Sequence, residues 1–108
     1  MKHIETIDIY HRNTYFIGFK LPDGFDLNAD RSEYSKVANI DSDDLEQAFY
    51  LTQNIDTLWT DRDISLSPIV TNFVKNKGAR STSVGDIFVK GGVAYFVSGS
   101  GFEIIGNW

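Results

Sequence analysis

The sequence predicts an α+β fold, in which an antiparallel sheet of about five strands carries two helices packed on one face. Three observations predict it. Apolar runs near both ends of the chain are rich in β-branched and aromatic residues, the middle holds an apolar stripe at helical spacing, and a Gly-Gly pair joins two late apolar runs. The expected order of elements is ββααβββ, and residues 1–108 form a single domain.

A β-hairpin is expected first. Its strands are 4–10 and 14–19, two runs of isoleucine and aromatic residues on either side of a polar turn. The Leu-Pro-Asp-Gly run at 21–24 ends the hairpin, because proline presets a turn. Residues 23–40 have no clear period, so we expect a surface loop that holds a short helical or extended piece.

Two helices are expected next. The first begins at the oxygen-bearing residues 41–44 and runs to about Asn54, since apolar residues recur at helical spacing and Asp43 and Glu46 have capping-box spacing. The second is expected over 67–78, where serine is the cap and proline takes the first helical position. Lysines and a glycine give that helix a normal end.

Three strands are expected in the last part of the chain, at 86–90, 93–98 and 102–105. The Gly-Gly pair at 91–92 joins the first two, because both residues can take the positive φ of a tight type I′ turn. A Gly-Ser-Gly run at 99–101 joins the second strand to the third.

Length and composition suit one hydrophobic core. The chain has 108 residues, of which 42% are hydrophobic and 14% aromatic, so wholesale disorder is not expected. The absence of cysteine excludes disulfides and thiolate zinc sites and is typical of a reducing compartment. No apolar run approaches the length that crosses a bilayer. We therefore expect a cytoplasmic protein with no cofactor and no membrane partner.

Charge is distributed unevenly around a net value of −5. Residues 23–63 hold eleven acids and three bases, a local balance of −8, whereas the chain from Ile64 onward has a balance of +2. An acidic middle disfavours binding to nucleic acid, which needs clustered positive charge. It suits an acidic surface that docks on a basic partner, or an ordinary solvated face.

The candidate partner-binding site combines acids at the start of the first expected helix with aromatic side chains that can anchor an interface. Its members are Asp41, Asp43, Asp44, Glu46, Tyr34, Tyr50 and Trp59.

A second candidate site is a run that offers one cation, three hydroxyls and backbone amides to a phosphate or carboxylate. Its members are Arg80, Ser81, Thr82 and Ser83. The structural interpretation of this run is that its hydroxyls cap turn amides while Asp86 accepts bonds from the turn before it. His3 and His11 are expected to be ordinary surface residues, so no metal site is predicted.

Part of the chain resembles the YodL-like group of small domains in phage and mobile-element proteins. The likeness rests on 45–49, on 52–56 with Trp59, on the Arg-Ser-Thr-Ser-Val-Gly-Asp run at 80–86, and on Tyr95 with Gly101 and Phe102. The first forty residues do not match, and the insert 60–79 is longer than that group would have. The resemblance implies a small accessory protein of a phage or mobile element and carries over no catalytic residue.

We therefore expect a non-enzymatic protein that binds a host or phage protein. It is expected to be either a monomer or a strand-paired dimer. A phage origin favours inhibition of a host nucleic-acid enzyme by the acidic region 23–63. The alternative is a weak nucleic-acid or nucleotide binder that uses the basic patch around Arg80. A small hydrolase is disfavoured, because both histidines lie on the first expected hairpin, away from any serine that they would activate.

Overall fold

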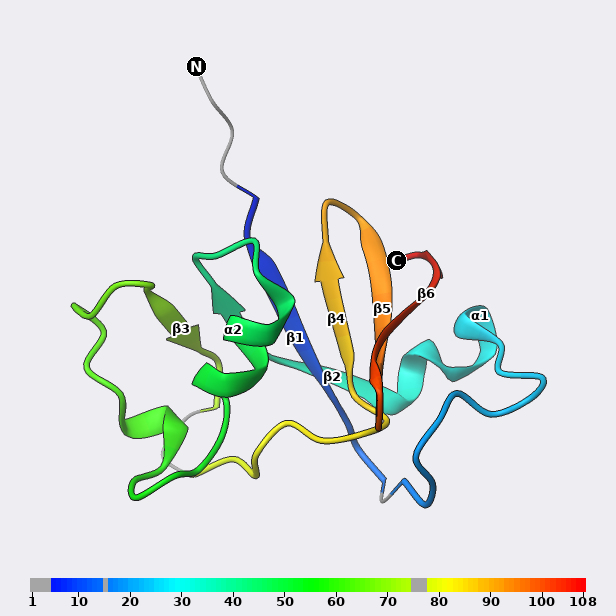
Figure 1. Cartoon of the computed structure of the whole chain (residues 1–108), viewed down its shortest axis with the longest axis horizontal. Coiled ribbons are helices and arrows are strands. Elements are labelled where there is room, and N and C mark those ends of the chain that lie inside the picture. Colours follow the sequence, from blue (N-terminus) through cyan, green and yellow to red (C-terminus); the bar gives the residue numbers. More distant parts are fainter. Residues whose placement is uncertain (1–4, 15, 75–77) are drawn as a thin grey trace.

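The structure, a computed structural model, describes residues 5–14, 16–74 and 78–108 and confirms the α+β fold. Within these residues six strands form one antiparallel sheet in the order β3-β2-β1-β4-β5-β6 (Figure 1). The strands are β1 (Ile7–Arg12), β2 (Tyr34–Ile40), β3 (Val70–Asn72), β4 (Ile87–Lys90), β5 (Val93–Ser98) and β6 (Gly101–Asn107). The helices of the same residues are α1 (Leu27–Asp30) and α2 (Leu45–Leu51), with 3₁₀ turns η1 (Arg31–Glu33) and η2 (Trp59–Asp61).

The expected first hairpin is wrong. The strand β1 forms, but the described residues of 14–19 form no second strand, because β1 pairs with β2 on one side and with β4 on the other. Both edges of β1 are therefore occupied. Residues after β1 leave the sheet, and the ring of Phe16 packs edge-on against that of Phe96, with 5.6 Å between the ring centroids.

Residues 23–40 are more ordered than a surface loop. They contain α1, capped by the carboxylate of Asp26, and the central strand β2. The register between β1 and β2 shifts after Ile9, which pairs with Ala38 while Tyr10 pairs with Lys36. One residue of β2, Val37, is therefore extra, as in a β-bulge. The bulge breaks the period-2 alternation on which strand prediction depends.

The first expected helix is confirmed as α2, which ends at Leu51 rather than near Asn54. Its N-cap is Asp44, whose carboxylate accepts hydrogen bonds from the amides of Glu46 and Gln47. The expected capping box of Asp43 and Glu46 is therefore wrong by one residue. A seven-residue helix of this kind depends on packing for its stability, and Ala48, which is fully buried, provides the contact with the sheet.

The second expected helix is wrong, and a strand occupies part of its range. Val70 pairs with Ile40, and Asn72 pairs with Ala38, so β3 extends the sheet beyond β2. Val70 is β-branched and buried, which suits a strand. Its partner β2 lies in the range where a surface loop with a short helical or extended piece is predicted. Residues 75–77 at the end of the expected helix lie outside the described residues. The described part therefore has one more strand than predicted and a different order of elements.

The three strands at the end of the chain are confirmed as β4, β5 and β6. Gly91 and Gly92 join β4 to β5 with φ values of 58° and 76°, as a type I′ turn requires.

Apolar side chains cover both faces of the sheet. On the face turned to the viewer in Figure 1, α2 packs over Ile7, Ile9 and Phe88. On the opposite face, Leu27 of α1 packs with a second cluster that contains Ile87 and Val89. Alternate residues of β4 thus point into different clusters, as the strand period demands. The two helices therefore lie on opposite faces, which corrects the prediction that both pack on one.

Gly85 and Gly92 form a matched pair of positions with positive φ. A Cβ atom on Gly85 (φ 99°) would lie 2.6 Å from the ring of Phe16, whereas one on Gly92 (φ 76°) would meet no atom within 4 Å. We expect Gly92→Ala to lower the free energy of unfolding by about 1–2 kcal/mol through backbone strain. Gly85→Ala should lower it by about 1–3 kcal/mol more through overpacking. Urea unfolding of both variants checks this, and equal losses would contradict the Phe16 contact.

Candidate functional site

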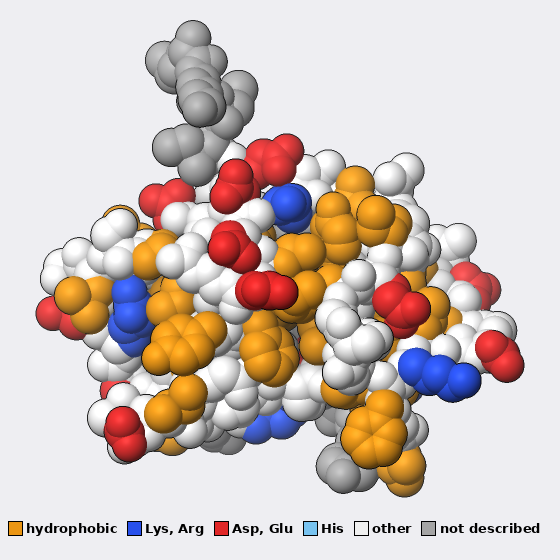
Figure 2. Space-filling view, in the orientation of Figure 1, with side chains coloured by type: hydrophobic (Ala, Val, Ile, Leu, Met, Phe, Trp, Pro, Cys, Tyr) orange, Lys and Arg blue, Asp and Glu red, His pale blue; other side chains and the backbone are white. Residues whose placement is uncertain are grey.

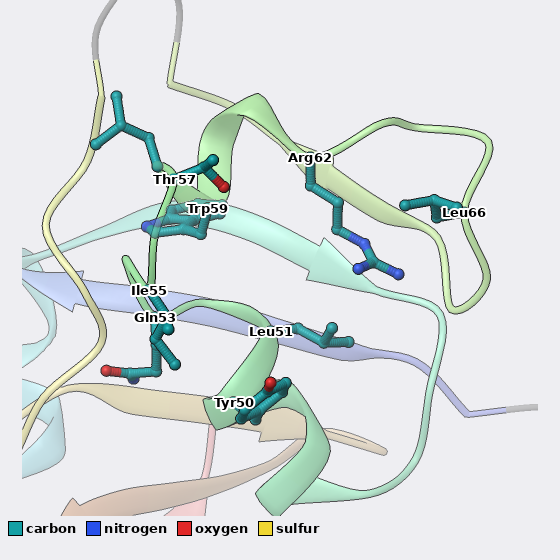
Figure 3. Close-up of a pocket in the computed structure, with 9 residues that line it drawn as sticks. Tyr50, Leu51, Gln53, Ile55, Thr57, Trp59, Arg62 and Leu66 are labelled. Carbon is teal, nitrogen blue, oxygen red and sulfur yellow. The ribbon is translucent and has the colours of Figure 1, made fainter.

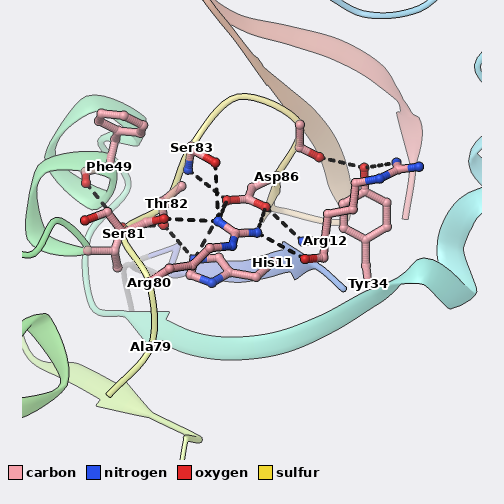
Figure 4. A network of polar contacts seen from close by, with 12 residues as sticks. His11, Arg12, Tyr34, Phe49, Ala79, Arg80, Ser81, Thr82, Ser83 and Asp86 are labelled. Atoms are coloured by element: carbon pink, nitrogen blue, oxygen red, sulfur yellow. Dashed lines mark hydrogen bonds and ion pairs between the residues drawn. The ribbon is translucent and has the colours of Figure 1, made fainter. Parts of the chain in front are cut away.

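A buried polar network connects the run before β4 to the end of β1 (Figure 4). Its centre is Asp86, whose side chain is 1% exposed. One carboxylate oxygen accepts from the backbone amide of Arg12 at 2.8 Å, and the other accepts from the amide of Ser83 at 2.8 Å. The guanidinium of Arg80 donates to both oxygens, each at 2.7 Å. Asp86 is therefore held by a bidentate ion pair and two backbone donors, the arrangement that best stabilises a buried carboxylate.

A chain of hydroxyl groups continues the network beneath α2. The Thr82 hydroxyl donates to Thr52 Oγ1 at 2.8 Å, and the Thr52 hydroxyl donates to the carbonyl of Ala48 at 2.9 Å. His11 Nε2 lies 2.9 Å from Thr82 Oγ1. Because the Thr82 proton is already directed at Thr52, His11 Nε2 must be the donor, which fixes the Nε2–H tautomer.

His11 is buried rather than on the surface as predicted, with 6% of the residue exposed. It lies in β1, on the same face of the sheet as Ile7 and Ile9. The pKa of His11 is lowered from 6.5 to about 4. Burial is the largest cause, Asp86, whose carboxylate is 3.9 Å from Nε2, raises the pKa in part, and Arg80 lowers it. His11 is therefore neutral at physiological pH. His3 lies outside the described residues.

Tyr34 closes the network on the other face of the sheet. Its hydroxyl donates to the carbonyl of Gly85 at 2.6 Å and accepts from the guanidinium of Arg12 at 3.2 Å. Burial raises the pKa of this hydroxyl. The residue is 8% exposed, so Tyr34 is not the exposed interface anchor that the sequence suggests.

Residues 80–83 chiefly make contacts that hold the protein together. Arg80 is paired with Asp86, the Ser81 hydroxyl accepts from the amide of Asn54 at 2.8 Å, and Thr82 is buried in the hydroxyl chain. Ser83 Oγ accepts from Arg80 at 3.3 Å and has no other hydrogen-bond partner among the described residues. These contacts favour the structural interpretation over the anion-binding site predicted there, since the cation already has a carboxylate partner.

A histidine and a hydroxyl do meet, although not in a form that suits hydrolysis. His11 and Thr82 have the spacing of a base and a nucleophile, yet Thr82 is 2% exposed and a substrate has no access to it. In the described ranges, no group of three or more His, Cys, Asp or Glu side chains is placed to hold a metal ion.

The predicted acids lie together at the exposed start of α2. Asp41, Asp43, Asp44 and Glu46 are all exposed, and Asp44 also caps the helix. Tyr50 is 66% exposed and lies one helical turn after Glu46, on the same side of α2. Figure 2 shows acidic side chains gathered on this face, with hydrophobic side chains beside them. We call Asp41, Asp43, Asp44, Glu46 and Tyr50 the α2 face.

Trp59 is not part of the α2 face. It is 4% exposed, and its indole nitrogen donates to the carbonyl of Arg80 at 3.0 Å. It therefore fastens the loop after α2 to the polar network, which corrects the prediction that it is available to a partner.

Sequence reasoning missed a hollow of about 260 Å³ beside the end of α2 (Figure 3). Residues between 50 and 66 line it. The apolar ones are Tyr50, Leu51, Ile55, Leu58, Trp59 and Leu66, and the polar ones are Gln53, Thr57 and Arg62. The only signal in the sequence is a set of apolar residues between 55 and 66 that follows neither a helical nor a strand period. Such residues have no obvious place in a core.

Comparison of the chain with known protein families, with curated proteins and with solved structures finds no match. The likeness to YodL-like domains therefore stays a prediction. Among the described residues no helix is long and apolar enough to cross a membrane. The two edge strands of the described sheet are β3 and β6. A dimer in which one of these edges pairs with a second copy stays a prediction.

Replacement of the Asp86 carboxylate tests the network. Asp86→Asn keeps the shape of the side chain but turns one accepting oxygen into a donor that faces Arg80 and one backbone amide, either that of Arg12 or that of Ser83. We expect the free energy of unfolding to fall by about 3 kcal/mol, measured by urea unfolding. Glu103→Gln, which neutralises an exposed acid on β6, serves as the control and should change it little. Similar effects of the two substitutions would contradict a central role for Asp86.

His11 makes stability depend on pH. In the unfolded chain its pKa returns to 6.5, whereas in the folded chain it is about 4, so between these values the unfolded state binds more protons. The free energy of unfolding should therefore fall as pH drops from 6.5 to 4, by up to about 3 kcal/mol. His11→Gln, which can still donate to Thr82, should lose this part of the dependence. Urea unfolding of both proteins from pH 6.5 to 4 tests this prediction. If the free energy of unfolding fell equally in both proteins, His11 would not be the cause of the pH dependence.

Proposed function

We propose that this chain is a binding protein whose α2 face docks on a basic surface of a partner protein. The observation that carries the proposal is the exposure of four acids and one tyrosine on and before a single short helix. Asp41, Asp43 and Glu46 have no ion-pair partner among the described residues. The ammonium of Lys90 reaches the backbone carbonyl of Asp43 rather than a carboxylate.

Both parts of the α2 face suit an interface. Unpaired acids attract a basic surface over long range and accelerate association, an effect that added salt screens. Tyrosine is favoured as an interface anchor because its ring buries a large area while its hydroxyl keeps a hydrogen bond. The Tyr50 hydroxyl and ring are free to do this, since the residue is 66% exposed.

The resemblance to phage and mobile-element proteins narrows the class of partner that we propose. A nucleic-acid enzyme of a host cell has a basic groove, because it must neutralise phosphates. An acidic protein that occupies such a groove would inhibit the enzyme by excluding its substrate. The net charge of −5 supports this choice over direct binding of nucleic acid.

Charge reversal on the α2 face tests the proposal. In the triple variant, Asp41, Asp43 and Glu46 become lysine, while Asp44 is kept because it caps α2. A tagged form of each protein is used to capture partners from the lysate of a candidate host, at low and at high salt, with identification by mass spectrometry. We expect the unaltered protein to retain a stoichiometric partner at low salt only. The triple variant should capture at least about tenfold less of this partner.

The matched control reverses the same number of charges away from the α2 face. It converts Asp23, Glu33 and Glu103, all exposed, to lysine and should keep the partner. Equal loss in both triple variants would mean that only net charge matters, which contradicts a defined face. Retention of nucleic acid without a protein partner would also contradict the proposal, and would move the site to Arg80 and its basic neighbours.

A further inference from the structure

The hollow beside the end of α2 contains a cation, Arg62, that forms no ion pair with a carboxylate among the described residues. Arg62 Nη2 donates to the carbonyl of Pro68 at 3.2 Å. Its Nε is buried and has no hydrogen-bond partner, which is true of no other buried side-chain nitrogen or oxygen in the part of the chain that the structure describes. A buried donor without an acceptor is unusual in proteins and is often explained by a group that binds there.

Neighbouring acids do not supply the missing acceptor. Within residues 5–14, 16–74 and 78–108, no carboxylate lies within 4.0 Å of the Arg62 guanidinium. The adjacent carboxylate of Asp63 accepts from the amide and the hydroxyl of Ser65, at 2.9 and 2.8 Å, and is thereby held in its own turn. Arg62 is therefore available to an anion from outside.

Apolar side chains line the hollow around this cation together with Gln53 and Thr57, and the hollow is partly open to solvent. Ile55, Leu58 and Leu66 are 53%, 42% and 49% exposed, and they line the hollow together with Leu51 and Tyr50. Figure 3 shows the Arg62 side chain extending between Leu66 and the end of α2. An apolar surrounding strengthens the attraction of a guanidinium for an anion, and small-molecule sites combine such a wall with one charged group.

We propose that this hollow binds a small apolar carboxylate, with the carboxylate on Arg62 and the apolar group against Leu51, Leu58 and Leu66. A guanidinium presents two parallel donors that match the geometry of a carboxylate. The volume of about 260 Å³ is near the lower limit for ligand sites, so it admits one branched aliphatic group or one aromatic ring. Asp61 and Asp63 are exposed on either side of Arg62, and their charges disfavour a doubly charged phosphate. This inference does not rest on the proposed partner.

The test uses isocaproate, a branched aliphatic acid, and its uncharged amide as a matched pair of probes. Each is titrated into the nitrogen-15-labelled protein, and amide chemical shifts are followed by NMR. Isocaproate should shift the amides of residues 50–66 with a Kd on the order of millimolar. The amide should bind at least about tenfold more weakly, because it cannot form the charge-assisted pair. Equal binding of acid and amide would overturn the proposal.

Variants separate the cation from the overall charge. Arg62→Gln should weaken isocaproate binding at least about tenfold, whereas Lys20→Gln, the same charge change at an exposed residue, should leave it unchanged. Absence of shifts in residues 50–66, or equal binding of inorganic phosphate, would also overturn the proposal. Because the acid and the amide are compared on the unaltered protein, the result does not depend on the folding of a variant.

N-acetyl-leucine distinguishes the two sources of such a ligand. It carries the same branched group and carboxylate as the end of a peptide chain. Tighter binding than isocaproate would assign the site to the C-terminal residue of a peptide, and equal or weaker binding would assign it to a free acid. The lysine variant of the α2 face keeps Arg62 and should still bind isocaproate, so failure of the partner proposal and failure of this one give different results.

Discussion

The carboxylate of Asp86 joins the end of β1 to the run before β4, two parts of the chain that are far apart in the sequence. It accepts from the backbone of Arg12 at the end of β1, from Arg80 and Ser83 in the preceding run, and it leads directly into β4. A buried carboxylate without such donors would cost several kcal/mol. The pairing of β1 with β4, and the course of the run across the end of β1, therefore depend on the donors being present together.

The same interaction decides which polar groups remain for function. Arg80, Thr82 and His11 lie in a run and a strand that the sequence offers as chemically suggestive, yet their polar groups bond to one another and to Asp86. Groups in a satisfied buried network stabilise one arrangement and do not exchange partners readily. Among the described residues, groups with few protein partners include the acids and Tyr50 on the outer side of α2, and Arg62 in the loop after it.

Local signals predicted the parts of the fold that local physics determines. The Gly-Gly turn before β5 and the start of α2 need only the conformational freedom of glycine and a short side chain that caps free amides. Strands β2 and β3 could not be found in this way. The bulge at Val37 hides the alternation of β2, and the three residues of β3 form a strand only because β2 is there to pair with them. His11 is buried for the same reason, since β1 became an inner strand.

Whether a candidate site could be predicted from the sequence also depends on whether local or long-range contacts form it. The acids of the α2 face were predictable because a helix start attracts such residues, whereas Arg62 gains its surroundings from a loop that returns to the end of α2. The seven residues of α2 span about 10 Å, slightly more than the Debye length of about 8 Å at physiological ionic strength. The attraction between the acids at its start and Arg62 near its end is therefore largely screened. Two groups of opposite charge, one at the start and one near the end of a short helix, can thus be recognised separately, by different parts of one partner or by two ligands.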